Sequence, residues 1–106
     1  MNLREPLPSR HRCETFKVKM GSGSWFVNLG FYEDGRIGEL NLNTSKAGSD
    51  YREAMGLTGM FASLALQAGV PVEELIELMQ ETNDYNVFKK IAEIMRDPDG
   101  FKCEVQ

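Results

Sequence analysis

Residues 29–40, Leu-Gly-Phe-Tyr-Glu-Asp-Gly-Arg-Ile-Gly-Glu-Leu, hold the turn signal from which the fold of this chain can be worked out. Asp34-Gly35 is typical of a two-residue β-hairpin turn, whose central positions favour residues that tolerate positive φ. With that turn, the expected partners across the hairpin are Phe31 with Gly38, Leu29 with Leu40, and Val27 with Leu42. The apolar side chains of both strands therefore fall on one face.

A second turn signal, Gly21 to Ser24, predicts another hairpin before the first. If these four residues form the loop, Met20 pairs with Trp25, Val18 with Val27, and Phe16 with Leu29. A one-residue slip would turn an apolar set to water, so agreement between the two turns predicts a three-stranded antiparallel meander. Its core face would carry Phe16, Val18, Met20, Trp25, Val27, Leu29, Phe31, Leu40 and Leu42.

The opposite face of this sheet mixes lysine, asparagine and aromatic residues. It should carry Thr15, Lys17, Lys19, Phe26, Asn28, Gly30, Tyr32, Ile37, Glu39, Asn41 and Asn43. One interpretation is the solvated side of an antiparallel sheet. The other is a patch of Phe26, Tyr32 and Ile37 that meets a second subunit or a flat ligand.

Three helices are expected after the meander. The first begins at Ser49 or Asp50, and it is apolar nearly all round as far as Ala68, which is typical of a covered helix. Gly56, Gly59 and Ser63 form a narrow stripe on it. Close packing of another backbone should offset the cost of the glycines, and we expect a partner within the chain rather than a symmetry mate.

Gly69 and Pro71 separate the first helix from the second, which has Val72, Leu75, Ile76 and Met79 on its apolar side. A third helix should run from about Asn86 to Arg96. The tail 101–105 alternates in polarity and could add a fourth, C-terminal edge strand. The predicted fold is α+β, with one face of the meander covered by three helices, in a domain at 13–106 after an extended arm at 1–12.

Composition narrows the classes of partner. The 106 residues carry a net charge of −4, which disfavours a nucleic acid polymer as the partner. No apolar run is long enough to cross a bilayer and no signal peptide is apparent, so a cytoplasmic protein is expected. Cys13 and Cys103 are either two reduced thiols or a bridge between the chain ends, and the sequence leaves both open.

The turn from Lys46 to Ser49 is the best candidate for an anion site. A helix N-terminus offers free N–H groups and partial positive charge, Gly48 permits close approach, and Lys46 adds a full charge. The assisting residues would be Arg10 or Arg12 for charge and Phe26 or Tyr32 for stacking. The alternative is that Ser49 and Asp50 only cap the helix, since Asp50 would oppose an anion. The turn is not a Walker A loop.

Metal binding and catalysis have little support in the sequence. His11-x-Cys13 with Cys103 supplies three soft ligands, whereas a closed zinc site needs four. No carboxylate can be placed to orient His11 as a base. We therefore expect no metal, no cofactor and no enzymatic activity.

Four stretches of the chain resemble a known family. They are Arg4-x-x-Leu7-Pro8-x-Arg10, Tyr32-Glu33-Asp34-Gly35-Arg36-x-Gly38-Glu39-Leu40, Lys46-x-Gly48-Ser49, and Leu64-Ala65-Leu66-Gln67-x-Gly69-Val70-Pro71-x-Glu73-Glu74-Leu75. Together they are similar to the TSCPD domain, found near the C-terminus of adenosylcobalamin-dependent ribonucleotide reductases and in small free-standing proteins. The Thr-Ser-Cys-Pro-Asp motif does not occur here, nor does a Cys-x-x-Cys pair. The resemblance implies a fold and a non-catalytic accessory character.

Two hypotheses follow for the function. The first is a free-standing module that forms a homo-oligomer and binds, and could sequester, a phosphorylated or nucleotide-like molecule, as small phage-encoded sponges do. The second is an accessory domain that docks on a ribonucleotide reductase or another large enzyme through the Arg4 to Arg12 arm.

Overall fold

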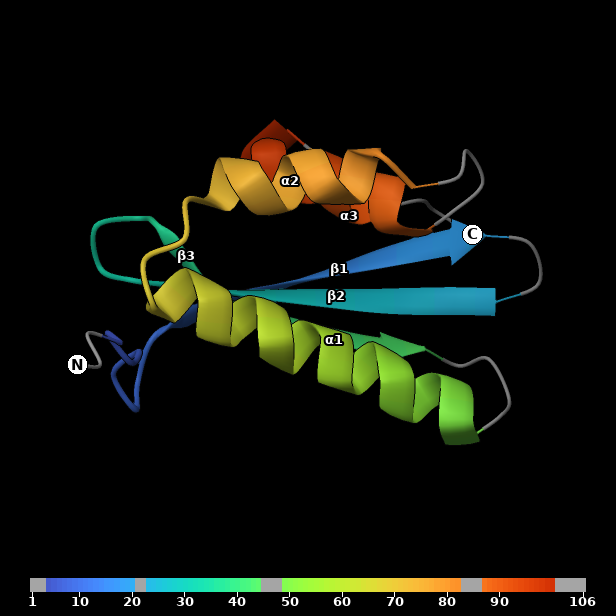
Figure 1. Cartoon of the computed structure of the whole chain (residues 1–106), viewed down its shortest axis with the longest axis horizontal. Helices are drawn as coiled ribbons and strands as arrows, with labels where there is room; N and C mark the ends of the chain where they lie inside the picture. Colours follow the sequence, from blue (N-terminus) through green and yellow to red (C-terminus); the bar gives the residue numbers. More distant parts are fainter. Residues whose placement is uncertain (1–3, 21–22, 45–48, 83–86, 101–106) are drawn as a thin grey trace.

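The computed structural model describes residues 4–20, 23–44, 49–82 and 87–100, in which three strands precede three helices (Figure 1). The elements are β1 (Arg12–Met20), β2 (Gly23–Phe31), β3 (Ile37–Thr44), α1 (Ser49–Gln67), α2 (Val72–Gln80), α3 (Val87–Arg96) and a short 3₁₀ turn at Pro98–Gly100. This arrangement confirms the predicted α+β class. The expected strand at 101–105 lies outside the described residues.

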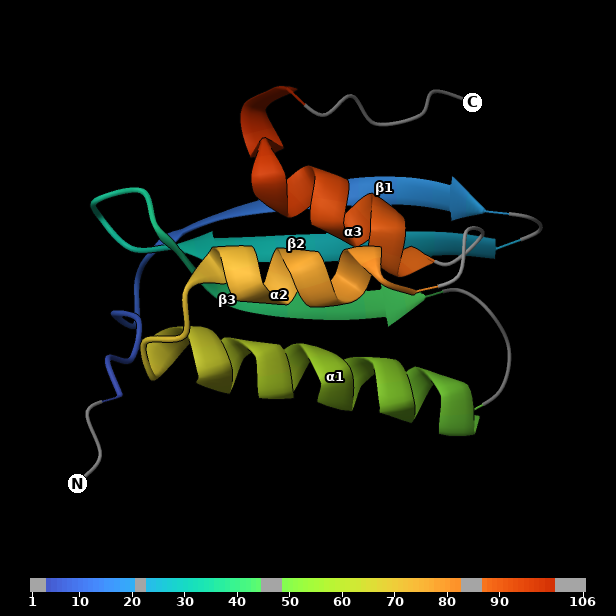
Figure 2. The same ribbon diagram turned by 45° about the horizontal axis from the view of Figure 1, so that its top comes forward.

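The three strands form one antiparallel sheet in the order β1-β2-β3. Its core face carries the predicted apolar set, apart from Met20, whose side chain lies outside the described residues. Val27, Leu29 and Leu40 are fully buried, and Ile91 and Ile94 of α3 are too. Helices α2 and α3 lie over this face, while α1 runs alongside β3 (Figure 2).

The β2–β3 turn is longer than predicted. Tyr32 N–H donates to Arg36 O and Gly35 N–H donates to Tyr32 O, while Gly35 adopts φ of 96°. These contacts define a three-residue loop with its last residue left-handed, rather than a two-residue turn. Phe31 consequently pairs with Ile37, not with Gly38.

A β-bulge then cancels this shift. Gly30 pairs with Glu39, so Gly38 is the extra residue on β3, and beyond it the partners are those predicted, Leu29 with Leu40 and Val27 with Leu42. The ring of Tyr32 lies against Gly38, where a Cβ would approach its Cε2 to 2.5 Å. A glycine at 38 therefore allows the bulge to form under the tyrosine ring.

The β1–β2 register also differs from the prediction, by two residues. Met20 pairs with Gly23, Val18 with Trp25 and Phe16 with Val27, so only residues 21 and 22 connect the strands. The predicted four-residue loop was wrong because a shift of two leaves every side chain on the same face. Hydrophobic alternation cannot distinguish the two registers.

Helix α1 packs on the exposed edge of β3 through its small residues. The Ser63 Oγ accepts a hydrogen bond from Leu40 N–H at 2.8 Å and lies 3.1 Å from Leu40 O, to which its proton can be donated. Gln67 Nε2 donates to Gly38 O at 3.0 Å. A Cβ on Gly59 would lie 2.7 Å from Leu40 O. The expected packing partner of the stripe is therefore β3 of the same chain.

The outer side of α1 is uncovered, in contrast to the expectation of a covered helix. Met60 and Phe61 are 60 % and 61 % exposed, and Leu57 and Leu64 are also exposed. Only the side that meets β3 and the core is buried. Among the described residues, no helix combines the length and the hydropathy that a membrane span requires.

The α1–α2 connection follows the predicted pattern. Gly69 adopts φ of 106°, and the N–H of Val70 donates to Ala65 O, which together form a glycine C-cap. Pro71 precedes α2, whose buried side chains are Leu75, Ile76 and Met79.

We predict opposite effects for two alanine substitutions on α1. Gly59→Ala should lower the free energy of unfolding by about 1–3 kcal/mol, because the new Cβ meets the β3 backbone. Gly56→Ala is the matched control, since its Cβ would meet no atom within 4 Å, and it should raise stability by about 0.5–1 kcal/mol. Urea unfolding measures both. A Gly59→Ala protein as stable as the Gly56→Ala protein would contradict this packing.

Candidate functional site

The sheet face opposite the core is open and is organised in rows across the three strands. Cys13, Gly30 and Glu39 form one row, Thr15, Asn28 and Asn41 the next, and Lys17, Phe26 and Asn43 the third. Asn28 Nδ2 donates to Thr15 Oγ1 at 2.8 Å. The face therefore presents hydrogen-bonding groups on both sides of a central aromatic ring.

A shallow concavity of about 480 Å³ covers much of this face. Its lining residues are His11, Cys13, Thr15, Phe26, Asn28, Glu39, Asn41 and Asn43. Phe26 is 37 % exposed there. The volume falls within the usual range for small-molecule sites, about 300–1,000 Å³.

One end of the concavity holds a cluster that sequence analysis missed. His11 Nε2 lies 3.0 Å from Glu39 Oε1, and His11 Nδ1 lies 2.7 Å from Pro8 O. Glu39 is therefore the carboxylate beside His11 that the sequence did not provide. The cross-strand row of Cys13, Gly30 and Glu39 would have revealed this cluster from the sequence. The predicted β1–β2 register instead placed Cys13 opposite Tyr32.

Hydrogen bonds and burial shift the pKa values of this cluster. The Pro8 carbonyl and the Glu39 carboxylate raise the pKa of His11. Burial, with a contribution from Glu39, raises the pKa of the Cys13 thiol. Cys13 is thus a free thiol with reduced thiolate character, and both nitrogens of His11 face oxygen atoms. The cluster lacks the activated thiolate of a cysteine nucleophile.

The start of α1, next to the predicted anion site, lies at the end of the sheet away from His11 (Figure 1). Lys46 and Gly48 fall outside the described residues, and Ser49 is the first residue of α1, with a side chain that is also outside them. The flanking Thr44 pairs with Trp25, next to the row of Phe26. Phe26 is therefore the predicted site residue on the open face near this end.

The remaining predicted residues gather at the opposite end, where β1 begins. Arg10, Arg12 and Tyr32 line a small cavity of about 150 Å³. Tyr32 is 7 % exposed, and its hydroxyl donates to Glu5 O at 2.5 Å. The guanidinium of Arg12 lies 4.1 Å from the centre of the Phe31 ring. Within one chain, Arg10, Arg12 and Tyr32 therefore lie at the opposite end of the sheet from Phe26.

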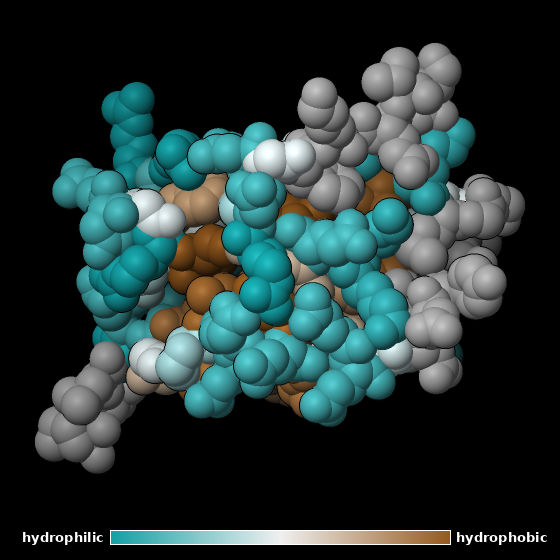
Figure 3. Space-filling model, turned by 90° about the horizontal axis from the view of Figure 1, so that it is seen from above, coloured by the Kyte–Doolittle hydropathy of each residue, from teal (hydrophilic) through white to brown (hydrophobic). Residues whose placement is uncertain are grey.

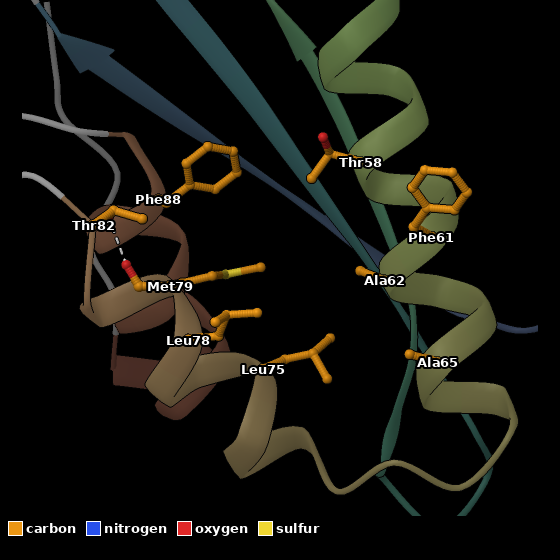
Figure 4. A pocket seen from close by; sticks show the side chains of 9 residues that line it. All are labelled: Thr58, Phe61, Ala62, Ala65, Leu75, Leu78, Met79, Thr82 and Phe88. Carbon is orange, nitrogen blue, oxygen red and sulfur yellow. Dashed lines mark hydrogen bonds between the residues drawn. The ribbon is translucent and has the colours of Figure 1, made fainter.

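A separate apolar groove of about 390 Å³ runs between α1 and α2 (Figure 4). Ala62 and Ala65 face Leu75 across it, and Phe61 and Leu78 also line it. Figure 3 shows hydrophobic surface between the polar side chains on the side of α2 and α3. Leu78 is 69 % exposed, so the groove has an apolar rim as well as an apolar wall.

Comparison with known proteins places the chain in a family. The family model described as the TSCPD domain matches residues 2–103, which is nearly the whole sequence. The chain belongs to the TSCPD family. This membership confirms the resemblance found in the sequence motifs.

The curated relatives of this TSCPD domain are much larger proteins. Vitamin B12-dependent ribonucleotide reductase of Agrobacterium fabrum is 39 % identical over 74 residues, which are 70 % of this chain and 6 % of that protein. Those of Bradyrhizobium diazoefficiens and Rhodopirellula baltica are 34 % and 33 % identical over 73 % and 74 % of the chain, and 6 % and 8 % of their own lengths. The chain thus spans less than a tenth of these relatives. No solved structure matches it.

We predict that, in protein freed of metal ions with a chelator, His11 has a pKa above its ordinary value of 6.5. The two oxygen atoms beside its ring stabilise the imidazolium. The imidazolium therefore contributes stability that is fully present below the unfolded-state pKa and is lost as pH rises through the folded-state pKa. NMR titration of this single histidine measures the value.

Glu39→Gln should lower the pKa of His11 while the bond to the Pro8 carbonyl keeps part of the shift. A wild-type pKa at or below 6.5, or no response to Glu39→Gln, would show that the pair does not form in solution.

Proposed function

We propose that this TSCPD domain is a non-enzymatic binding module whose open sheet face holds a phosphorylated or nucleotide-like molecule. The observation that carries the proposal is the exposed ring of Phe26 in the middle of a polar, concave face. An exposed aromatic ring on a sheet is a natural platform for a flat heterocycle, since every nucleobase offers a π face for stacking.

The residues beside Phe26 supply complementary chemistry. Asn41 and Asn43 come from the adjacent strand, and an amide side chain both donates and accepts hydrogen bonds, as the edge of a base requires. Lys17 of β1 is the cross-strand partner of Phe26, and Lys19, two residues further along β1, lies on the same face. Two ammonium groups beside the ring position favour a ligand that carries negative charge.

The proposal retains Lys46, Gly48 and Ser49 as the contacts of the phosphate groups. Thr44 and Asp50, which flank them, belong to the same end of the molecule as Phe26 and Asn43. The negative charge of Asp50 would repel an anion at this end, so the positive charges of Lys17, Lys19 and Lys46 must outweigh it. Arg10 and Arg12 could join the site only from a second copy of the chain, whereas Tyr32 is buried between Gly38 and the Arg36 guanidinium and is not available for stacking. A module of this kind would act by sequestering its ligand.

We further propose that the chain forms a homo-oligomer through the outer side of α1. Soluble monomers rarely expose a contiguous set of large apolar side chains, and Leu57, Met60, Phe61 and Leu64 are such a set. The groove beside them is apolar and open, so the same region offers both a ridge and a hollow to a second copy.

The accessory-domain hypothesis remains the second candidate. It is favoured by the relatives, in which the matched region is a small part of a ribonucleotide reductase chain. Its contact residues would lie in the arm, where Arg10 and Arg12 are exposed.

We predict that protein purified natively carries a small molecule that absorbs at 260 nm, and that Phe26→Ala weakens its binding by about 5- to 150-fold. This range corresponds to the roughly 1–3 kcal/mol that stacking on an aromatic ring contributes. Phe26→Tyr is the matched control, because it keeps the ring, and it should retain the ligand. Native mass spectrometry followed by denaturation identifies the released molecule.

Lys46→Ala should also release the ligand without changing the melting temperature of ligand-free protein. A wild-type chain that neither carries nor binds a nucleotide-like molecule would contradict the proposal. In that case, loss of binding to a large partner enzyme on Arg10→Glu would support the accessory role.

For the oligomer, we predict that Phe61→Asp yields a single-chain mass by light scattering, whereas the wild type has a multiple of it. Phe61 is 61 % exposed in one chain, so the substitution should leave the folded chain intact. The control is Glu77→Lys. Glu77 is an exposed residue of α2 that does not line the groove, so this variant should keep the wild-type mass. A wild-type protein with the mass of one chain would contradict the assembly.

A further inference from the structure

The cluster at the end of the open face has the composition of a metal site. One ligand atom each from His11, Cys13 and Glu39 lies within 4.8 Å of the other two. A tetrahedral zinc ion, at about 2.0–2.1 Å from nitrogen or oxygen and about 2.3 Å from sulfur, sets its ligand atoms roughly 3.3–3.7 Å apart. Small side-chain rotations would therefore bring the three atoms to this spacing.

The orientation of His11 suits metal coordination better than it suits general base catalysis. Its Nδ1 lies 2.7 Å from Pro8 O, where a ring N–H can donate to the carbonyl. Nε2 lies 3.0 Å from Glu39 Oε1, so a metal ion that replaces the Nε2 proton would meet both the imidazole nitrogen and the carboxylate. A histidine whose other nitrogen donates to a backbone carbonyl is the common arrangement for a metal ligand.

The backbone beneath the cluster leaves room for these side chains. Gly30 lies between Cys13 and Glu39 in the same row. A Cβ at this position would collide with the Glu39 carboxylate and would approach His11 Cδ2 to 3.2 Å. The absence of a side chain at position 30 thus creates the space in which the imidazole and the carboxylate meet.

We propose that His11, Cys13 and Glu39 bind a divalent transition-metal ion of the zinc type. Mixed nitrogen, sulfur and oxygen donors fit zinc, whereas magnesium and calcium prefer oxygen alone. Thiolate and carboxylate together balance the two positive charges of the ion, and binding releases the thiol proton of Cys13. Three protein ligands leave a fourth position for water or for an oxygen of a bound molecule.

This site differs from the one considered in the sequence, where Cys103 was the third ligand. It replaces Cys103, which lies outside the described residues, with a carboxylate that the sheet register places beside the histidine. The inference does not depend on the proposed nucleotide-like ligand, because Phe26 lies two rows away on the face.

The test uses the full chain without a histidine tag, stripped with a chelator. Zn²⁺ is titrated in competition with a chromogenic chelator, and Co²⁺ is then substituted to report on the ligands by absorption. We expect one ion per chain, with a thiolate-to-cobalt charge-transfer band in the near ultraviolet. Cys13→Ser should abolish that band and weaken Zn²⁺ binding by more than about 100-fold.

Two further variants keep the test specific. Glu39→Gln should weaken Zn²⁺ binding but retain the thiolate band, while Cys103→Ser, the control for the second thiol, should change neither. Far-ultraviolet circular dichroism in chelator confirms that each variant is folded. The proposal is overturned if the wild type does not bind Zn²⁺ stoichiometrically, if the band follows Cys103 rather than Cys13, or if Glu39→Gln binds as tightly as the wild type. Phe26→Ala should leave Zn²⁺ affinity unchanged even if it releases the nucleotide-like ligand.

Discussion

The hydroxyl of Ser63 meets both the N–H and the C=O of Leu40 on the free edge of β3, and Gln67 reaches the carbonyl of Gly38, two residues earlier in the chain. An unpaired strand edge is a template for association, and these two side chains of α1 occupy it as a neighbouring strand would. The contact requires a close approach of helix and strand, which Gly59 permits. These polar contacts hold α1 on β3 together with Met55 and Leu66, which are buried in the core.

Gln67 extends the same contact to the N-terminal arm. Its side-chain oxygen accepts from Arg4 Nε at 2.8 Å, and its backbone carbonyl accepts from Glu5 N–H at 2.7 Å. Glu5 in turn holds the hydroxyl of Tyr32. The arm is therefore tied to the body of the domain at the end of α1, and this places Pro8 where its carbonyl meets His11.

Because α1 uses its small residues to cover a strand edge, several of its large apolar side chains are left on the outside. A helix that lay flat over the sheet would have buried Met60 and Phe61. Here Met60 is exposed and Phe61 lines an open groove, which is the physical basis for proposing that the domain associates with a second copy. The opposite face of the sheet stays open because α2 and α3 cover the core side and α1 lies at the edge of β3.

The sequence by itself determined most of the side chains that the strands and α2 turn to the core, because alternation in the strands and helical spacing after Pro71 leave one face that buries them. It placed Tyr32 and Ile37 on the open face, whereas Tyr32 is buried and Ile37 packs against the core. It also determined the family, through motifs that span most of the chain. Only the tertiary structure decided the register of β1, because a shift of two residues preserves alternation and costs no burial. That register joins Cys13, Gly30 and Glu39 in one row, and so the histidine, thiol and carboxylate cluster could not be found before the strands were paired. The docking of α1 was likewise undetermined, since a glycine and serine stripe signals close approach without naming the surface that approaches.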